Sequence, residues 1–155
     1  MKDLARLNAL YSKLDGMLDA ALAGASGLEA DRIRGDQALN DQACFVLCWG
    51  QLEFTIDQAC RDVIRRRRSH SDWQIRRGWD LYNPDDPRLS GLPFEGRASL
   101  VLDRAEGRGR PYALAMRHYE MRNRIAHGRL DQTRIDLASV IRDFYTIQAA
   151  LHRAT

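Results

Sequence analysis

Apolar residues recur every three or four positions through most of the chain, which is the spacing of a helix face. The first stripe, in residues 3–22, consists of Leu4, Leu7, Leu10, Tyr11, Leu14, Met17, Leu18, Ala21 and Leu22. The second, in residues 36–68, consists of Leu39, Ala43, Val46, Trp49, Leu52, Ile56, Ala59, Cys60, Val63 and Ile64. We therefore predict two long helices, separated by the small residues at 24–27. Gly50, in the middle of the second, predicts a close helix crossing or a bend.

The periodicity lapses in residues 69–97. Pro84, Pro87 and Pro93 interrupt any long helix there. Trp73 and Trp79 lie in the same stretch, which is too apolar for a free linker. We expect a packed, variable excursion that contains a helical turn, with the tryptophans either anchoring it to the core or stacking on unpaired bases.

Three further helices are predicted after the excursion. A short one covers residues 98–106, and a longer one covers 111–127, with Pro111 in its first turn and Gly128 as a left-handed cap. The last begins after Asp131, a good N-cap, and runs through Leu151. No strand pattern or internal repeat is present, so we predict an all-α fold. It is a single domain of residues 1–155, a helical bundle of four main helices plus a short fifth.

Composition supports a folded domain outside the membrane. Hydrophobic residues make up 45% of the chain and charged residues 29%, which are ordinary globular values. No apolar run approaches the roughly 20 residues of a membrane helix, and the first residues lack the pattern of a secretory signal. We expect a cytoplasmic protein.

The three cysteines, Cys44, Cys48 and Cys60, do not suggest a disulfide framework because their number is odd. They also fall short of the four ligands that a structural zinc site requires. We expect buried, reduced thiols and neither a metal nor a cofactor.

Arginine dominates the basic residues, since only Lys2 and Lys13 are lysine among 24. The densest cluster contains seven arginines and two aspartates in residues 61–77, a local balance of +5. Arg65, Arg66, Arg67 and Arg68 are candidates for holding an RNA backbone. The alternative is a solvated helix end where cations are favoured by the helix dipole, and the sequence leaves both open.

Two polar features of the predicted helices each have two interpretations. Glu53 and Asp57 lie four residues apart, either on the solvated side of the second helix or facing the functional site. His118 lies four residues before Arg122 and is a candidate to line an RNA-binding groove, although a surface histidine is the simpler expectation.

Candidate chemistry concentrates in the sequence Arg122-Asn123-Arg124-Ile125-Ala126-His127. RNA cleavage without a metal needs a group that moves protons near neutral pH, for which histidine is suited. It also needs a fixed cation at the phosphate, which arginine supplies. On a helix Arg122 and His127 diverge by about 140°, so the two serve one site most easily when two copies of the helix pair. Arg124 is a further candidate RNA contact.

This segment resembles the Arg-x4-His motif of HEPN domains, in its Arg-Asn form. HEPN proteins are helical bundles that often act as ribonucleases in toxin, abortive-infection and CRISPR-linked defence systems. The resemblance implies that Arg122 and His127 are catalytic, with Asn123 as a polar helper. It also implies a homodimer in which two motifs form one RNA-cleaving site without a cofactor, and an antitoxin or regulatory protein as a further partner.

Other interpretations of the motif remain. A histidine before a helix-ending glycine is often only a capping residue, and Arg122 then pairs with Glu120 or Asp103. In a further alternative, the chain is a non-catalytic HEPN subunit that binds RNA or a nucleotide, or that only dimerises. In the branch of the family silenced by adenylylation a tyrosine follows the motif histidine by two positions. Arg129 stands there, so that mode of control is not expected.

Overall fold

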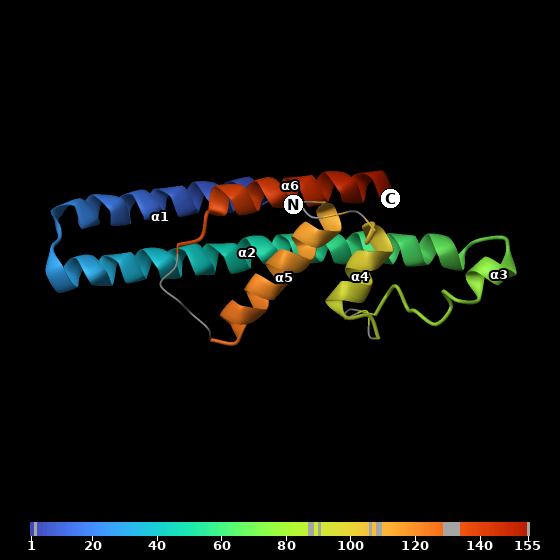
Figure 1. Cartoon of the computed structure of the whole chain (residues 1–155). Coiled ribbons are helices and arrows are strands. Elements are labelled where there is room, and N and C mark those ends of the chain that lie inside the picture. The colour runs from blue at the N-terminus through green and yellow to red at the C-terminus, as the bar shows by residue number, and fades with distance from the viewer. Residues whose placement is uncertain are drawn as a thin grey trace. The chain divides into compact units, whose positions relative to one another are not determined.

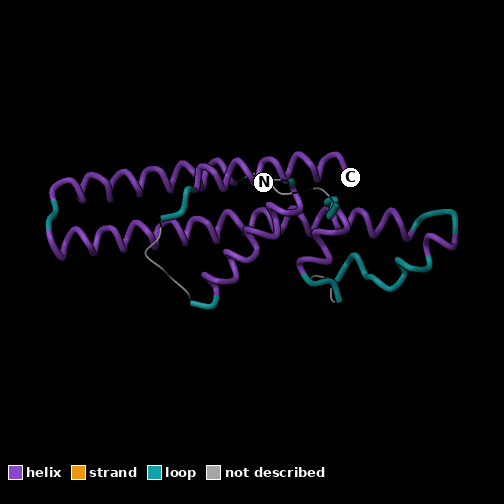
Figure 2. Tube along the Cα trace, in the orientation of Figure 1, coloured by secondary structure: helices purple, strands orange, loops and turns teal. Residues whose placement is uncertain are grey.

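The structure, a computed structural model, describes residues 1, 3–86, 89, 91–105, 107, 110–128 and 134–154. Figure 1 shows its helices, which are α1 (Leu4–Gly24), α2 (Gly27–Arg68), α3 (Trp73–Arg76), α4 (Phe94–Val101), α5 (Pro111–Ala126) and α6 (Leu137–Ala154). In these residues Figure 2 contains helices and connecting segments and no strand. The predicted all-α class is therefore confirmed.

The second helix begins nine residues earlier than predicted, at Gly27 instead of residue 36. Gly27 has a φ of 55°, a left-handed conformation that glycine adopts without strain and that allows a tight reversal after α1. Ala30 and Ile33 are buried, so the apolar face of α2 continues into this early part. Sequence periodicity missed it because charged residues separate the two buried positions.

The starts of two later helices were also predicted wrongly. The short helix is Phe94–Val101 instead of residues 98–106, and it buries Phe94, Ala98 and Val101. Glu106 lies outside the described residues. The last helix starts at Leu137, and its cap is Asp136, whose Oδ1 accepts a hydrogen bond from the backbone N–H of Ser139 at 3.0 Å. Asp131, the expected cap, lies outside the described residues.

The excursion contains the expected helical turn, α3, whose start is capped by Asp72 accepting from the Gln74 amide at 2.8 Å. The expectation that Trp73 anchors it to the core is wrong, because Trp73 is 56% exposed. The Arg77 guanidinium instead lies 5.1 Å from the centre of its ring. At the end of α5, Gly128 has a φ of 73°, which confirms the predicted left-handed cap.

The chain divides into two compact units that share α2, α5 and α6. One contains Met1–Gln51 and His118–Asp143, and the other contains Leu52–Arg117 and Phe144–Thr155. The largest buried side chains of the first unit include Leu4, Phe45, Trp49 and Leu137. Those of the second unit include Leu52, Ile56, Ile64, Phe144 and Ile147. Each unit therefore has an apolar core of its own.

In the first unit α1 lies antiparallel to the early part of α2 (Figure 1). The pairing leaves part of the α1 stripe in solvent, since Leu10, Leu14 and Met17 are 55%, 41% and 62% exposed. The sequence stripe is thus wider than the face that α2 covers. Such residues flank the contact instead of filling it.

The cysteine prediction is confirmed, because Cys44, Cys48 and Cys60 are buried and free of disulfides. Burial raises the pKa of the Cys60 thiol to about 11, so it stays protonated. In the described part of the chain no group of three or more histidine, cysteine or acidic side chains is arranged to hold a metal ion. None of the helices described is long and apolar enough to cross a membrane.

Candidate functional site

The candidate site lies at the C-terminal end of α5. The helix ends at Ala126, and its hydrogen bonding continues for one more step, from the His127 amide to the Asn123 carbonyl at 3.0 Å. Gly128 then turns the chain and donates to the Ile125 carbonyl at 3.0 Å. The imidazole of His127 is therefore carried on a helical backbone, and the residue is exposed.

Arg122 occupies the opposite side of this last stretch of helix. It is partly buried, and its Nη1 donates to Oδ1 of the neighbouring Asn123 at 3.2 Å. The structure thus brings Arg122 and Asn123 together, whereas His127 is exposed. Within the described residues no contact joins Arg122 to Glu120 or Asp103, the pairs that a purely structural role suggested. Arg129, which follows the motif, lies outside those residues.

His118 is not on the surface, so the expectation of an exposed histidine that lines an RNA groove is wrong. It is 2% exposed, and its Nε2 lies 2.9 Å from Oδ2 of Asp143 on α6. Its ring packs near Phe45, with ring centres 6.1 Å apart. His118 therefore belongs to the core of the first unit, where it ties α5 to α6.

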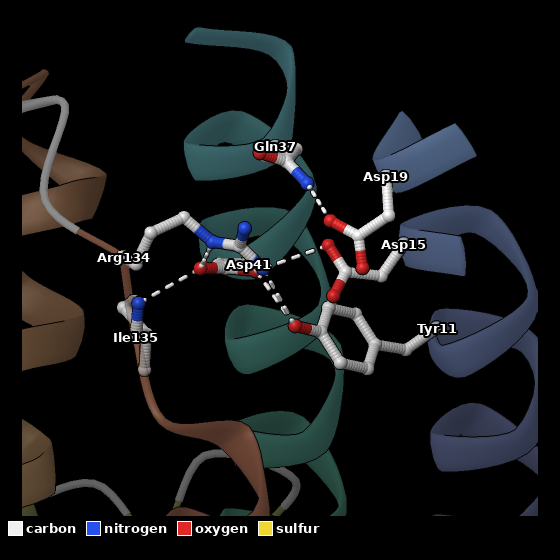
Figure 3. A network of polar contacts seen from close by, with 7 residues as sticks. All are labelled: Tyr11, Asp15, Asp19, Gln37, Asp41, Arg134 and Ile135. Carbon is white, nitrogen blue, oxygen red and sulfur yellow. Dashed lines mark hydrogen bonds and ion pairs between the residues drawn. The ribbon is translucent and has the colours of Figure 1, made fainter. Parts of the chain in front are cut away.

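A buried carboxylate, Asp41 on α2, binds Arg134 and Ile135, which precede α6 (Figure 3). Asp41 is fully buried. It accepts hydrogen bonds from the Tyr11 hydroxyl at 2.8 Å, from Nε of Arg134 at 2.7 Å and from the Ile135 amide at 2.8 Å. A buried carboxylate is costly unless it is paired and hydrogen-bonded, and here three donors meet that need.

The same network extends to α1. Nη2 of Arg134 lies 2.7 Å from Oδ1 of Asp15, and Nε2 of Gln37 donates to Asp19 at 2.6 Å. Figure 3 shows the Arg134 side chain reaching between the carboxylates of α1 and α2. Arg134 and Ile135, which directly precede the start of α6, are therefore fastened to the helix pair α1–α2.

The pKa of Tyr11 is raised to about 12, mainly by burial and secondly by the hydrogen bond to Asp41. The hydroxyl is thus a donor at neutral pH, as the geometry requires. The Asp41 carboxylate raises the pKa of Arg134 further above its ordinary range, so the guanidinium remains charged. The network is a stable arrangement of fixed charges, and its role is to hold the fold together.

Glu53 and Asp57 are only partly exposed, with 31% and 19% of their side chains accessible, so the expectation of a solvated side of the helix is wrong. They hold Arg97, whose Nη2 lies 3.2 Å from Glu53 and whose Nη1 lies 2.8 Å from Asp57. Burial raises the pKa of Asp57, and the Arg97 charge opposes the shift. This cluster fastens α4 to α2 in the second unit.

The basic cluster is largely engaged with the excursion that follows it. Arg65 pairs with Asp85 at 3.0 Å, and Arg68 lies 3.5 Å from Asp80. Arg61 donates to the carbonyls of Pro84 and Asp86. Across residues 61–86 seven arginines meet five aspartates, so the local balance is +2 instead of +5. Arg66 and Arg67 are exposed.

Sequence reasoning missed Asp41, Arg134 and Asp143. A signal for Asp41 was present, because it interrupts the inward side of α2 between Ala38 and Cys44. An acidic residue at such a position predicts a buried partner. The identity of the partner, 93 residues away, was not accessible to local patterns.

Comparisons with family models, curated proteins and solved structures found no match to the chain.

Proposed function

We propose that the chain is a metal-independent endoribonuclease of HEPN type that acts in a toxin or anti-phage defence system. The observation that carries the proposal is the exposure of the motif end of α5, where His127 is open to solvent. An RNA strand can reach this imidazole without any rearrangement of the core. Arg122 binds the scissile phosphate, and Asn123 orients the Arg122 guanidinium, to which it is hydrogen-bonded.

The reaction proceeds through the ribose 2′-hydroxyl. The 2′-oxygen attacks phosphorus and loses its proton to His127, and the imidazolium formed then gives a proton to the leaving 5′-oxygen. The products are a 2′,3′-cyclic phosphate and a 5′-hydroxyl. Because Arg122 and His127 lie on different sides of one helix, the complete site requires two copies of α5, which makes the active form a homodimer. No cofactor takes part.

Cleavage of RNA by the purified protein in the presence of a metal chelator tests this proposal. We expect cutting by the wild type and none by His127→Ala. His152→Ala is the matched control, because His152 is also an exposed helical histidine and belongs to α6. Cutting that the chelator abolishes, or that His127→Ala retains, contradicts the mechanism.

A second function is favoured by the hydrogen bond between Arg122 and Asn123, which occupies the arginine within its own chain. In this alternative the chain is a non-catalytic subunit of a defence or toxin–antitoxin complex that binds RNA or a nucleotide, or that dimerises. RNA binding without any change in RNA length, in wild type and His127→Ala alike, distinguishes it. Growth arrest on expression, relieved by His127→Ala, favours the enzyme.

A further inference from the structure

The exposed side of α5 near its end presents a second cation beside His127. Arg124 precedes His127 by three residues, and residues three apart on a helix are surface neighbours about 5–6 Å apart at Cβ. Both residues are exposed. Arg122 lies on the other side of the helix, directly after the turn that buries His118.

Arg124 also differs from most arginines of the chain in its surroundings. Many guanidiniums are engaged by carboxylates or carbonyls, among them those of Arg34, Arg61, Arg65, Arg68, Arg97 and Arg134. In the described part of the chain Arg124 has no ion pair or side-chain hydrogen bond, and neither does the His127 ring. An unengaged guanidinium next to an exposed imidazole is suited to bind a phosphate at the point where the imidazole acts.

We propose that Arg124 is a catalytic residue that binds the scissile phosphate together with His127 of the same chain. The second copy's Arg122 then approaches the same phosphate from across the dimer. This inference rests on the proposed ribonuclease function. In that site Arg124 and His127 come from one chain, and Arg122 comes from the other. The division follows from the helix, because Arg124 and His127 lie about 60° apart around its axis, and Arg122 and His127 about 140° apart.

Single substitutions test the role of Arg124. Arg124→Gln should lower kcat for RNA cleavage by about 100-fold, the usual effect of removing one donor that stabilises transition-state charge. Arg124→Lys, which keeps the charge but not the planar fork, should recover part of the loss. Arg32→Gln is the control, because Arg32 is an exposed arginine on α2 of the same unit, and it should cleave like the wild type. An Arg124→Gln protein as active as the wild type overturns the inference.

Mixed dimers test which chain supplies each arginine. Dimers formed from Arg124→Gln and His127→Ala chains should be inactive, because no chain then keeps both members of the pair. Dimers formed from Arg122→Gln and His127→Ala chains should recover activity, since one composite site stays intact. Each variant homodimer assayed alone gives the background, which for Arg124→Gln is the residual activity predicted above. Recovery in the first mixture overturns the pairing of Arg124 with His127 in one chain. A wild-type protein that does not cut RNA instead contradicts the proposed function, and this inference with it.

Discussion

Asp41 is the buried carboxylate that links α1, α2 and the residues directly before α6. Its carboxylate is fully buried and accepts from Tyr11, Arg134 and the Ile135 amide. An asparagine at this position has nearly the same size but presents an N–H₂ group to a set of donors. The consequence of the substitution is therefore electrostatic, and packing is nearly unchanged.

Asp41→Asn should lower the free energy of unfolding by about 2 kcal/mol. The estimate is moderate because the Arg134 side chain is 42% exposed and water can solvate it when the pair is lost. Urea denaturation measures the change. Asp31→Asn is the control, since the Asp31–Arg34 pair is exposed on both sides and should cost less than about 1 kcal/mol. Equal, small effects of the two substitutions would show that the network contributes little.

Tyr11 should make the fold sensitive to high pH. Its pKa is raised from 10.0 to about 12, so the folded chain keeps a proton that the unfolded chain loses. The stability that depends on the protonated hydroxyl is complete below pH 10 and is lost as the pH rises toward 12. Urea titrations across this range should show a smaller alkaline loss for Tyr11→Phe than for the wild type. Tyr145→Phe, which alters an exposed ring, should follow the wild type, and parallel curves for Tyr11→Phe and the wild type would refute the expectation.

At the scale of single helices, two glycines have opposite roles. Gly50 lies within α2 and no atom lies within 4 Å of where a Cβ would stand, so the close crossing that its position suggested is not present. Gly128 has a φ of 73° at the end of α5, where other residues are strained.

Gly50→Ala should therefore raise the free energy of unfolding by about 1 kcal/mol, because alanine restricts the unfolded chain and favours the helix. Gly128→Ala serves as the opposed variant and should lower it by about 1 kcal/mol. Both values come from chemical denaturation monitored by helical circular dichroism. A destabilising Gly50→Ala would mean that α2 is bent or contacted at this glycine.

Much of the helical content could be predicted from the sequence, because burial of one face imposes a period of 3.6 residues. The ends of α1 and α5 followed from small residues and from Gly128. The starts of α2 and α6 could not be predicted in this way. The buried early turns of α2 contain few apolar residues, and Asp131 is as good a cap candidate by residue type as Asp136, which caps α6. Local patterns specify helices better than the exact residue at which each begins.

The candidate site was predicted in part for the same reason. The angular separation of Arg122 and His127 around α5 follows from spacing along one helix, whereas the exposure of His127 was not predicted. The burial of His118 depends on Asp143, 25 residues later. The loss of positive charge in the basic cluster depends on aspartates of the excursion that fold back onto α2. Contacts between distant segments decided each residue that the sequence misplaced.

For the whole molecule, two compact units share three helices, and the motif end of α5 belongs to the unit that contains α1 and the early part of α2. The Asp41 network and the His118–Asp143 pair fix the elements on either side of the motif within that unit. Under the proposed mechanism, a second copy of the chain and an RNA strand complete the site at the exposed His127.

The chemical form of the cut RNA ends tests the central claim most directly. Purified protein is incubated with a defined single-stranded RNA in the presence of a chelator, and the ends of the fragments are identified by mass spectrometry. The account predicts fragments that end in a 2′,3′-cyclic phosphate, and no cutting at a linkage whose ribose lacks the 2′-hydroxyl. Fragments that end in a 3′-hydroxyl, or cutting at the 2′-deoxy linkage, would contradict it.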